Sequence, residues 1–167
     1  MSNIAKYPEP NCQRLLSEFL RLIQIDSTSY REAAIASQLS ADLQSIGCTV
    51  VDDQSTAITG SDSGNLIATL PATPGQAGKL YFSAHMDSVE PGQGIKYQIE
   101  DGVISSQGQT ILAGDDKVGI AAALEMLRTL VESGLPHPEI VILLSVAEED
   151  GLIGARAMDG EALGFAG

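Results

Sequence analysis

Three short polar clusters in the sequence contain residue types that bind metal ions and transfer protons. They are HMD at residues 85–87, DDK at residues 115–117 and EED at residues 148–150. One imidazole and several carboxylates form a donor set that suits a borderline cation such as Zn²⁺, with Co²⁺ or Mn²⁺ as alternatives. Together the clusters predict a metal site that could support hydrolysis.

The first two clusters also have plainer interpretations. His85 could bind a metal while Asp87 fixes its tautomer, but a histidine at the edge of a core beside a solvated aspartate would look the same. Asp115 and Asp116 could simply cap a helix. Two adjacent carboxylates nevertheless exceed what one cap needs, and a carboxylate can bridge two cations.

The third cluster is the most informative, because its three acids follow the apolar stretch EIVILLSVA at residues 139–147. A solvated loop after a strand is the plainer interpretation. Neighbouring carboxylates that are partly buried repel each other, and one takes up a proton unless a cation compensates. The functional interpretation divides the pair, so that one glutamate binds a metal and the other acts as a general base.

The elements around these clusters alternate between helices and strands. Apolar spacing predicts a helix over residues 10–25, and a second helix that starts at a capping box of Ser29 and Glu32 and ends near Ile46. The remaining pattern predicts strands over residues 48–53, 65–70, 79–84 and 139–147. It also predicts helices over 116–133 and from about 154. A surface turn is expected at 71–78, and a loop with a hairpin over 90–112.

This order of elements predicts an α/β fold with three layers, in which a mostly parallel sheet is flanked by helices. The stretch at residues 139–147 has the profile of a strand that is buried on both faces. Ligands bind at the carboxyl edge of such sheets, and the three clusters would meet there.

Composition excludes several partners. The chain has 167 residues, the size of one domain, and its 22 acidic against 9 basic residues give a net charge of −13. That charge repels nucleic acid and anionic membrane surfaces. Cys12 and Cys48 form no CxxC motif, there is no signal-peptide pattern, and the apolar run at 140–144 is too short to span a bilayer. We expect a cytoplasmic protein without nucleic acid or membrane partners.

The end of the sequence is unusual, since a helix begins near Gly154 and no strand follows it. We expect the chain to be part of a larger protein, because a sheet that ended here would leave a buried strand with an unprotected neighbouring edge. If the polypeptide ended at Gly167, we would expect an exposed apolar sheet edge and hence aggregation or a need for a partner. A small domain with a frayed tail is the alternative.

Three motifs in sequence order resemble the M20 family of zinc metallopeptidases: SAHMDSV at 83–89, AGDDKVGIAA at 113–122 and SVAEEDGLIGA at 145–155. The DDK and EEDG forms resemble its tripeptidase (peptidase T-like) branch. The resemblance covers essentially the whole chain and implies a partial zinc-exopeptidase catalytic domain, residues 1–167 being its N-terminal portion. It implies a two-zinc aminopeptidase that acts on short peptides. The lid or dimerisation domain and the C-terminal catalytic part are absent, so a homodimer would form only through the missing domain.

The resemblance also implies a role for each residue. His85 would bind one zinc ion, and Asp87 would orient its imidazole. Asp115 would bridge both ions and Glu149 would bind the second. Glu148 would be the general base that takes a proton from water and gives it to the leaving amine.

Further expectations follow from the same resemblance. Asp116 would lie beside the site without binding metal, and the peptide bond between Asp115 and Asp116 would be cis. Members of the family have another carboxylate ligand and a late histidine that this sequence lacks, while His137 lies in the turn LPHP and is expected at the surface. We therefore expect the isolated chain to bind metal weakly and to show little activity.

Two other function classes stay open. Another M20-type amide hydrolase, such as an aminoacylase, a deacetylase or a dipeptidase, would share these motifs. A non-enzymatic acidic α/β module with a magnesium pocket would also gather acids at strand ends. Such a module needs no histidine and usually has a lysine at a late strand end, whereas Lys117 lies at a helix start. No glycine pattern for nucleotide binding is present.

Overall fold

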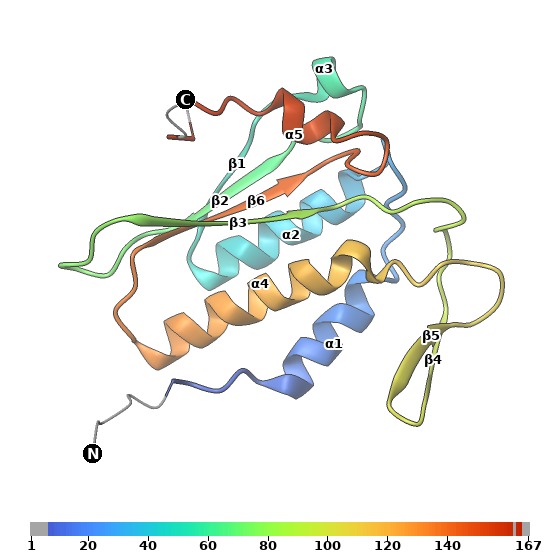
Figure 1. Ribbon diagram of the computed structural model, residues 1–167, viewed down its shortest axis with the longest axis horizontal. Coiled ribbons are helices and arrows are strands. Elements are labelled where there is room, and N and C mark those ends of the chain that lie inside the picture. The colour runs from blue at the N-terminus through green and yellow to red at the C-terminus, as the bar shows by residue number, and fades with distance from the viewer. Residues whose placement is uncertain (1–6, 162, 165–167) are drawn as a thin grey trace.

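A four-stranded sheet forms the centre of the computed structural model, which describes residues 7–161 and 163–164 (Figure 1). Its strands have the order β1-β2-β6-β3. Their bounds are Thr49–Asp52 for β1, Leu66–Leu70 for β2, Lys79–His85 for β3 and Glu139–Ser145 for β6. The predicted α/β class, with a sheet flanked by helices, is confirmed.

The sheet is mixed, because only β3 and β6 pair in parallel while β1–β2 and β2–β6 are antiparallel. The chain leaves β3, returns through a long helix and enters β6, and such a crossover brings two strands into parallel alignment. β2 is joined to β3 by the turn at 71–78 and runs in the opposite direction, so it meets β6 antiparallel. β6 therefore lies between β2 and β3, where its residues 140–145 are buried as predicted.

Helices cover both faces of the sheet (Figure 1). The larger layer consists of α1 (Cys12–Leu22), α2 (Ala33–Ile46) and α4 (Gly114–Ser133). The short helices α3 (Thr56–Thr59) and α5 (Ile153–Ala157) lie on the other face. The main core between sheet and larger layer is aliphatic, and its fully buried members include Leu22, Ile23, Ile35, Leu39, Leu43, Ile120, Leu124, Leu127, Ile140 and Ile142.

The helix starts differ in part from the prediction. α1 begins at Cys12 because the Asn11 side chain accepts a hydrogen bond from the backbone N–H of Arg14 (3.0 Å). The predicted capping box at α2 is wrong, since Glu32 stands at the N-cap without a side-chain cap bond. The side chains of Ser29 and Glu32 instead bind parts of the chain that are distant in sequence.

The predicted hairpin is confirmed. β4 (Tyr97–Glu100) and β5 (Val103–Ser106) pair antiparallel and stand apart from the main sheet (Figure 1). Asp101 and Gly102 between them both have positive φ (51° and 79°), which the tight turns of two-residue hairpins require.

Two expectations about single residues meet different outcomes. His137 is buried (8% exposed), so its predicted surface position is wrong. Its backbone N–H donates to Thr73 Oγ1 (2.9 Å) and its ring nitrogen Nδ1 lies 2.9 Å from the carbonyl oxygen of Pro138, which fixes the turn before β6. Cys12 and Cys48 are free, as the absence of a paired motif suggested. Within the described ranges, no helix combines the length and the apolar character needed to cross a membrane.

Candidate metal centre

The three polar clusters meet at one edge of the sheet. His85 is the last residue of β3, Asp115 lies at the start of α4, and Glu149 follows the end of β6. One ligand atom from each of these three side chains lies within 4.8 Å of the other two. The structure therefore brings together the imidazole and the two carboxylates that the family resemblance implies as metal ligands.

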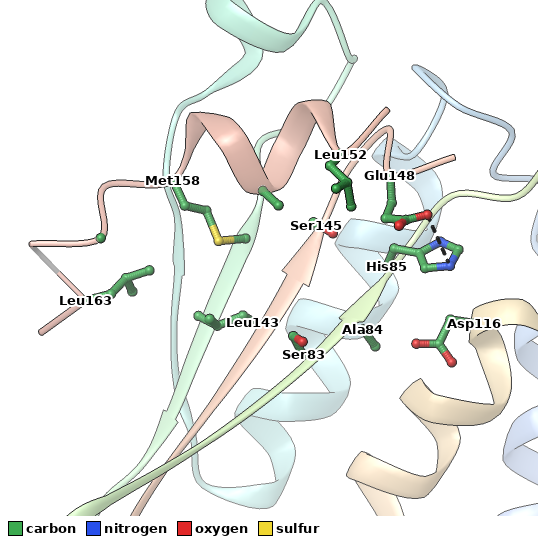
Figure 2. A pocket seen from close by; sticks show the side chains of 12 residues that line it. Ser83, Ala84, His85, Asp116, Leu143, Ser145, Glu148, Leu152, Met158 and Leu163 are labelled. Carbon is green, nitrogen blue, oxygen red and sulfur yellow. Dashed lines mark ion pairs between the residues drawn. The ribbon is translucent and has the colours of Figure 1, made fainter. Parts of the chain in front are cut away.

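His85 is buried between carboxylates. Its Nε2 lies 3.1 Å from Asp115 Oδ1 and 3.8 Å from Glu148 Oε2, and Figure 2 shows this approach of Glu148. Its Nδ1 lies 3.3 Å from Asp87 Oδ1. Burial lowers the pKa of His85, but the hydrogen bonds to Asp87 and Asp115 outweigh it and raise the pKa to about 9. Without a metal the ring is thus an imidazolium at neutral pH.

Asp87 is fully buried, and its carboxylate contacts other groups besides His85. Its carboxylate accepts hydrogen bonds from Ser29 Oγ (2.7 Å) and from the backbone N–H groups of Glu148 (3.0 Å) and Glu149 (3.2 Å). Burial raises the pKa of Asp87, but His85, Ser29 and the two N–H groups bring it down to about 2. Asp87 therefore stays ionised and connects the end of β3 to the loop after β6.

The two aspartates at the start of α4 have different tasks. The peptide bond between Asp115 and Asp116 is cis, as expected, and neither residue has helical backbone angles. Asp116 Oδ1 accepts a hydrogen bond from the N–H of Gly119 (3.1 Å), so Asp116 caps the regular part of the helix. A Cβ atom at Gly119 would lie 2.3 Å from that oxygen, which explains the glycine. Asp115 is left free to face His85, and its side chain is 84% exposed.

The site carries an excess of negative charge. Glu148 is half-buried and Glu149 is exposed, and they lie close to the carboxylates of Asp87 and Asp115. The pKa of Glu149 is raised by burial, against the opposing effect of His85, and the carboxylates of Asp115, Glu148 and Asp87 add to the rise. A divalent cation would compensate this surplus of carboxylates.

Sequence reasoning missed Lys117. Its side chain is buried, and its Nζ donates hydrogen bonds to the backbone oxygens of Met86 (2.5 Å) and Asp87 (3.4 Å). Burial lowers the pKa of Lys117 to about 8. The lysine joins the start of α4 to the end of β3. The sequence shows Lys117 in the DDK cluster. Its position at a helix start, however, gave no reason to expect that its ammonium group would be buried.

A pocket of about 420 Å³ opens beside His85 and Glu148 (Figure 2). It lies between the ends of β3 and β6 and helix α5, and its mostly apolar lining includes Ala84, Leu143, Leu152 and Met158. The candidate metal centre is thus adjacent to a space that could receive part of a ligand.

The family model described as Peptidase family M28 matches residues 65–160, which include all three clusters. The chain belongs to this peptidase family. It is 45% identical over 149 residues to protein YqjE of Bacillus subtilis, an alignment that covers 89% of this chain and 40% of the relative. It is 31% identical over 138 residues to Peptidase T of Escherichia coli, which covers 63% of this chain and 34% of the relative.

Solved structures of longer peptidases contain the same fold. Aminopeptidase PepT from Bacillus cereus matches with a TM-score of 0.89 and 46% identity, over 92% of this chain and 41% of that one. A tripeptidase from Staphylococcus aureus matches with a TM-score of 0.87 and 40% identity, over 91% of this chain and 41% of that one. The predicted resemblance to tripeptidases is confirmed, and the chain spans about 40% of the length of these structures.

Proposed function

We propose that this chain forms the metal-binding part of a two-zinc aminopeptidase of the tripeptidase type, which acts on short peptides. The observation that carries the proposal is the convergence of His85, Asp115 and Glu149 within 4.8 Å, next to Glu148. The likeness to PepT of Bacillus cereus supports it. In this proposal residues 1–167 are the N-terminal portion of the catalytic domain, and the lid or dimerisation domain and the remaining catalytic part lie outside them.

The residues present fit a zinc centre. One imidazole nitrogen and carboxylate oxygens are ordinary zinc ligands, and Co²⁺ or Mn²⁺ could occupy the same donors. His85 would hold one ion, Glu149 the other, and Asp115 both. When bound, the ions would lower the pKa of a water molecule and offset the charge of the surrounding carboxylates.

Glu148 is the proposed general base. It is half-buried, lies 3.8 Å from the imidazole of His85, and borders the pocket beside the centre. Its carboxylate would take a proton from water and later give that proton to the leaving amine of the cleaved peptide. Asp87 acts behind it, since it orients His85 and binds the N–H group of Glu148 (3.0 Å).

The proposal also covers the classification of the chain, its location and its partners. The M20 designation rests on the three ordered motifs alone. A cytoplasmic location is in line with two free cysteines, and the net charge of −13 disfavours nucleic acid and anionic membranes as partners. A homodimer, if one forms, would use parts outside this chain.

A chimera tests the function directly. This chain would replace the matching segment of PepT from Bacillus cereus, to which it is 46% identical. We expect the chimera with zinc to release the first residue from tripeptides.

In the chimera, Glu148→Gln should reduce kcat by a factor of about 10²–10⁴, because the proton transfer is lost. Elemental analysis should show unchanged zinc in this variant.

Glu9→Gln, at an exposed position, serves as the matched control and should leave kcat unchanged. A Glu148→Gln chimera with near-normal turnover would contradict the base assignment. A chimera that binds zinc and cleaves no tripeptide would contradict the proposed activity.

A dipeptidase is the second candidate. A solved aminoacylhistidine dipeptidase from Vibrio alginolyticus matches over 95% of this chain with a TM-score of 0.71 and 26% identity. The same chimera assayed with aminoacylhistidine dipeptides and with tripeptides separates the two candidates, and we expect the larger kcat/KM for the tripeptides.

A further inference from the structure

The loop that carries Glu148 and Glu149 is held by an uninterrupted row of hydrogen bonds to its backbone. Four consecutive N–H groups donate to side-chain oxygens of three buried residues from other segments. These bonds are Val146 N to Asn65 Oδ1 (3.0 Å), Ala147 N to Glu32 Oε1 (2.9 Å), Glu148 N to Asp87 Oδ1 (3.0 Å) and Glu149 N to Asp87 Oδ2 (3.2 Å). The direction of both glutamates therefore depends on Asn65, Glu32 and Asp87.

Glu32 is the unexpected member of this set. It is fully buried at the start of α2, yet its carboxylate makes no cap bond to that helix. Oε1 accepts from the backbone N–H of both Tyr30 (3.0 Å) and Ala147, and Oε2 accepts from Ser61 Oγ. Burying a carboxylate is costly unless its hydrogen bonds are made, and all three of these donors are neutral groups.

Ala147 is the point at which the loop turns. Its φ of 45° lies in the left-handed region, which is uncommon for an alanine. The Glu32 carboxylate binds the N–H of this same residue, directly before the proposed base and the proposed ligand. A loss of this contact would free the turn and change the direction of Glu148 and Glu149.

We propose that Glu32 is a positioning residue, which fixes Ala147 and thereby sets Glu148 and Glu149 at the metal centre. The zinc part of its test rests on the proposed two-zinc function. Glu32 does not touch the metal or the peptide in this proposal, and it acts through the backbone of the loop.

The geometry of Glu32 suggests three variants. Glu32→Ala leaves the N–H of Ala147 without its acceptor. Glu32→Gln keeps an amide oxygen for Tyr30 and Ala147, and its NH₂ group can donate to the Ser61 hydroxyl, so it should restore the loop. Glu32→Asp is shorter by one methylene group, loosens the same contact more mildly, and replaces the alanine variant if that variant does not fold.

Glu125→Ala is the matched control. Glu125 is also a buried glutamate with several hydrogen bonds, but it lies in the middle of α4 and binds Arg14 and the backbone of Asn11. Its removal should weaken the fold without any effect on the loop. The comparison therefore separates a positioning role from a general loss of stability.

Two measurements on the whole chain give the test. In a competition titration with a chromophoric chelator, Glu32→Ala should bind Zn²⁺ at least about tenfold more weakly than the wild type, and Glu32→Gln and Glu125→Ala within about threefold of it. In the metal-free protein, backbone hydrogen exchange at residues 147–149 should accelerate at least about tenfold in Glu32→Ala, relative to exchange in β6, but not in Glu32→Gln or Glu125→Ala.

Wild-type zinc affinity together with wild-type exchange in Glu32→Ala would overturn the inference. Equal effects of Glu32→Ala and Glu125→Ala on the loop would also overturn it, since the role would then be only structural. A wild-type chain that binds no zinc would count against the proposed function instead, and the exchange measurement would still decide the role of Glu32.

Discussion

His85 connects the protonation of the site with the proposed metal binding. Its Nδ1 faces Asp87 (3.3 Å) and its Nε2 faces Asp115 (3.1 Å), and these carboxylates hold the pKa of the ring at about 9 despite burial. A metal ion can bind only the unprotonated nitrogen. The same carboxylates that attract a cation therefore favour a proton that the cation must displace.

We predict that zinc binding at about pH 7.5 releases about one proton from His85, and that zinc affinity rises about tenfold per pH unit up to about pH 9. The sign follows because His85 carries a competing proton below its pKa and none above it. Calorimetric titrations in two buffers of different ionisation enthalpy would count the proton. His137→Ala, at the other histidine, should release the same number, and binding without proton release would contradict the assigned state of His85.

At the residue scale, the sequence indicated candidate metal ligands, but it did not indicate which residues hold them in place by hydrogen bonds. The three clusters could be located because imidazole and carboxylates follow predicted strands or start a helix. The choice of His85, Asp115 and Glu149 within them came from the resemblance to zinc metallopeptidases. Ser29 and Glu32 could not be assigned, because their spacing suggested a local capping box. Their actual contacts are to Asp87 and Ala147, 58 and 115 residues away along the chain, and only the folded backbone shows such contacts.

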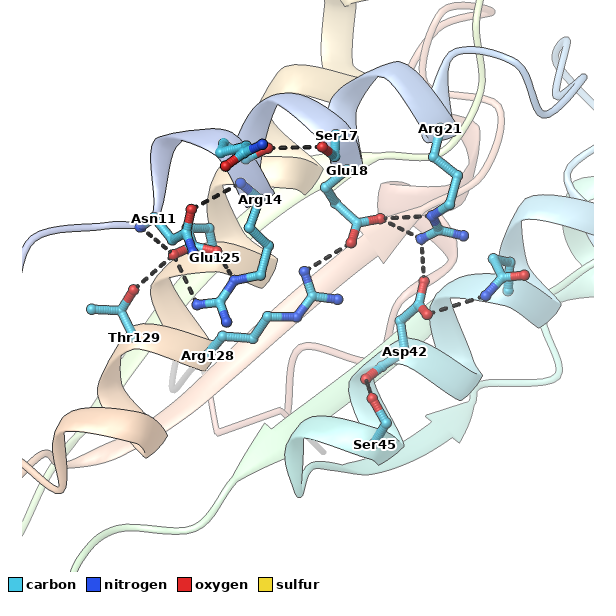
Figure 3. A network of polar contacts seen from close by, with 12 residues as sticks. Asn11, Arg14, Ser17, Glu18, Arg21, Asp42, Ser45, Glu125, Arg128 and Thr129 are labelled. Carbon is cyan, nitrogen blue, oxygen red and sulfur yellow. Dashed lines mark hydrogen bonds and ion pairs between the residues drawn. The ribbon is translucent and has the colours of Figure 1, made fainter.

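The three helices of the larger layer are joined by charged side chains as well as by apolar packing (Figure 3). Ion pairs connect α1 to α4 through Arg14 with Glu125 and Glu132 and through Glu18 with Arg128. Arg21 connects α1 to α2 through Asp42 and also pairs with Glu18 within α1. Glu125 is nearly inaccessible, with a side chain that is 2% exposed, whereas that of Glu132 is 59% exposed. The two glutamates that share Arg14 should therefore contribute unequally to stability.

We predict that Glu125→Ala lowers the free energy of unfolding by about 1.5–3 kcal/mol, because Arg14, Asn11 and Thr129 lose their acceptor. Glu132→Ala should lower it much less than Glu125→Ala does, since exposed ion pairs contribute little to stability. Urea denaturation of the two variants measures both values. Equal losses in the two variants would contradict the larger contribution expected from the buried glutamate.

Periodicity located most elements, because each helix or strand face has a local apolar pattern. The 20-residue helix α4 and the buried strand β6 were predicted nearly in full. The antiparallel pairing of β2 with β6 was not predictable, because strand order depends on contacts between distant segments. At the start of α4, Asp116 caps the helix and Asp115 faces His85. These different roles depend on the backbone angles of the two residues, which composition does not reveal.

The described residues combine an acidic edge, where the candidate metal ligands lie, with a sheet that is incompletely covered. β3 forms one border of the sheet and exposes Leu80 (49%) and Phe82 (39%). Such an edge favours association with other chains or segments. The chain also spans about 40% of its solved relatives, so turnover is a property to be tested in a longer enzyme, and metal binding is the property to be tested in this chain.

Zinc binding by the triad is the central claim. Equilibrium dialysis followed by elemental analysis would measure zinc per chain for the wild type and for His85→Ala, Asp115→Ala and Glu149→Ala. Asp150→Ala, at an exposed acid beside the triad, is the control. We predict that the wild type and the control bind zinc, and that each triad variant binds it at least about tenfold more weakly. Equal zinc in all five proteins, or none in the wild type, would contradict the proposed metal centre.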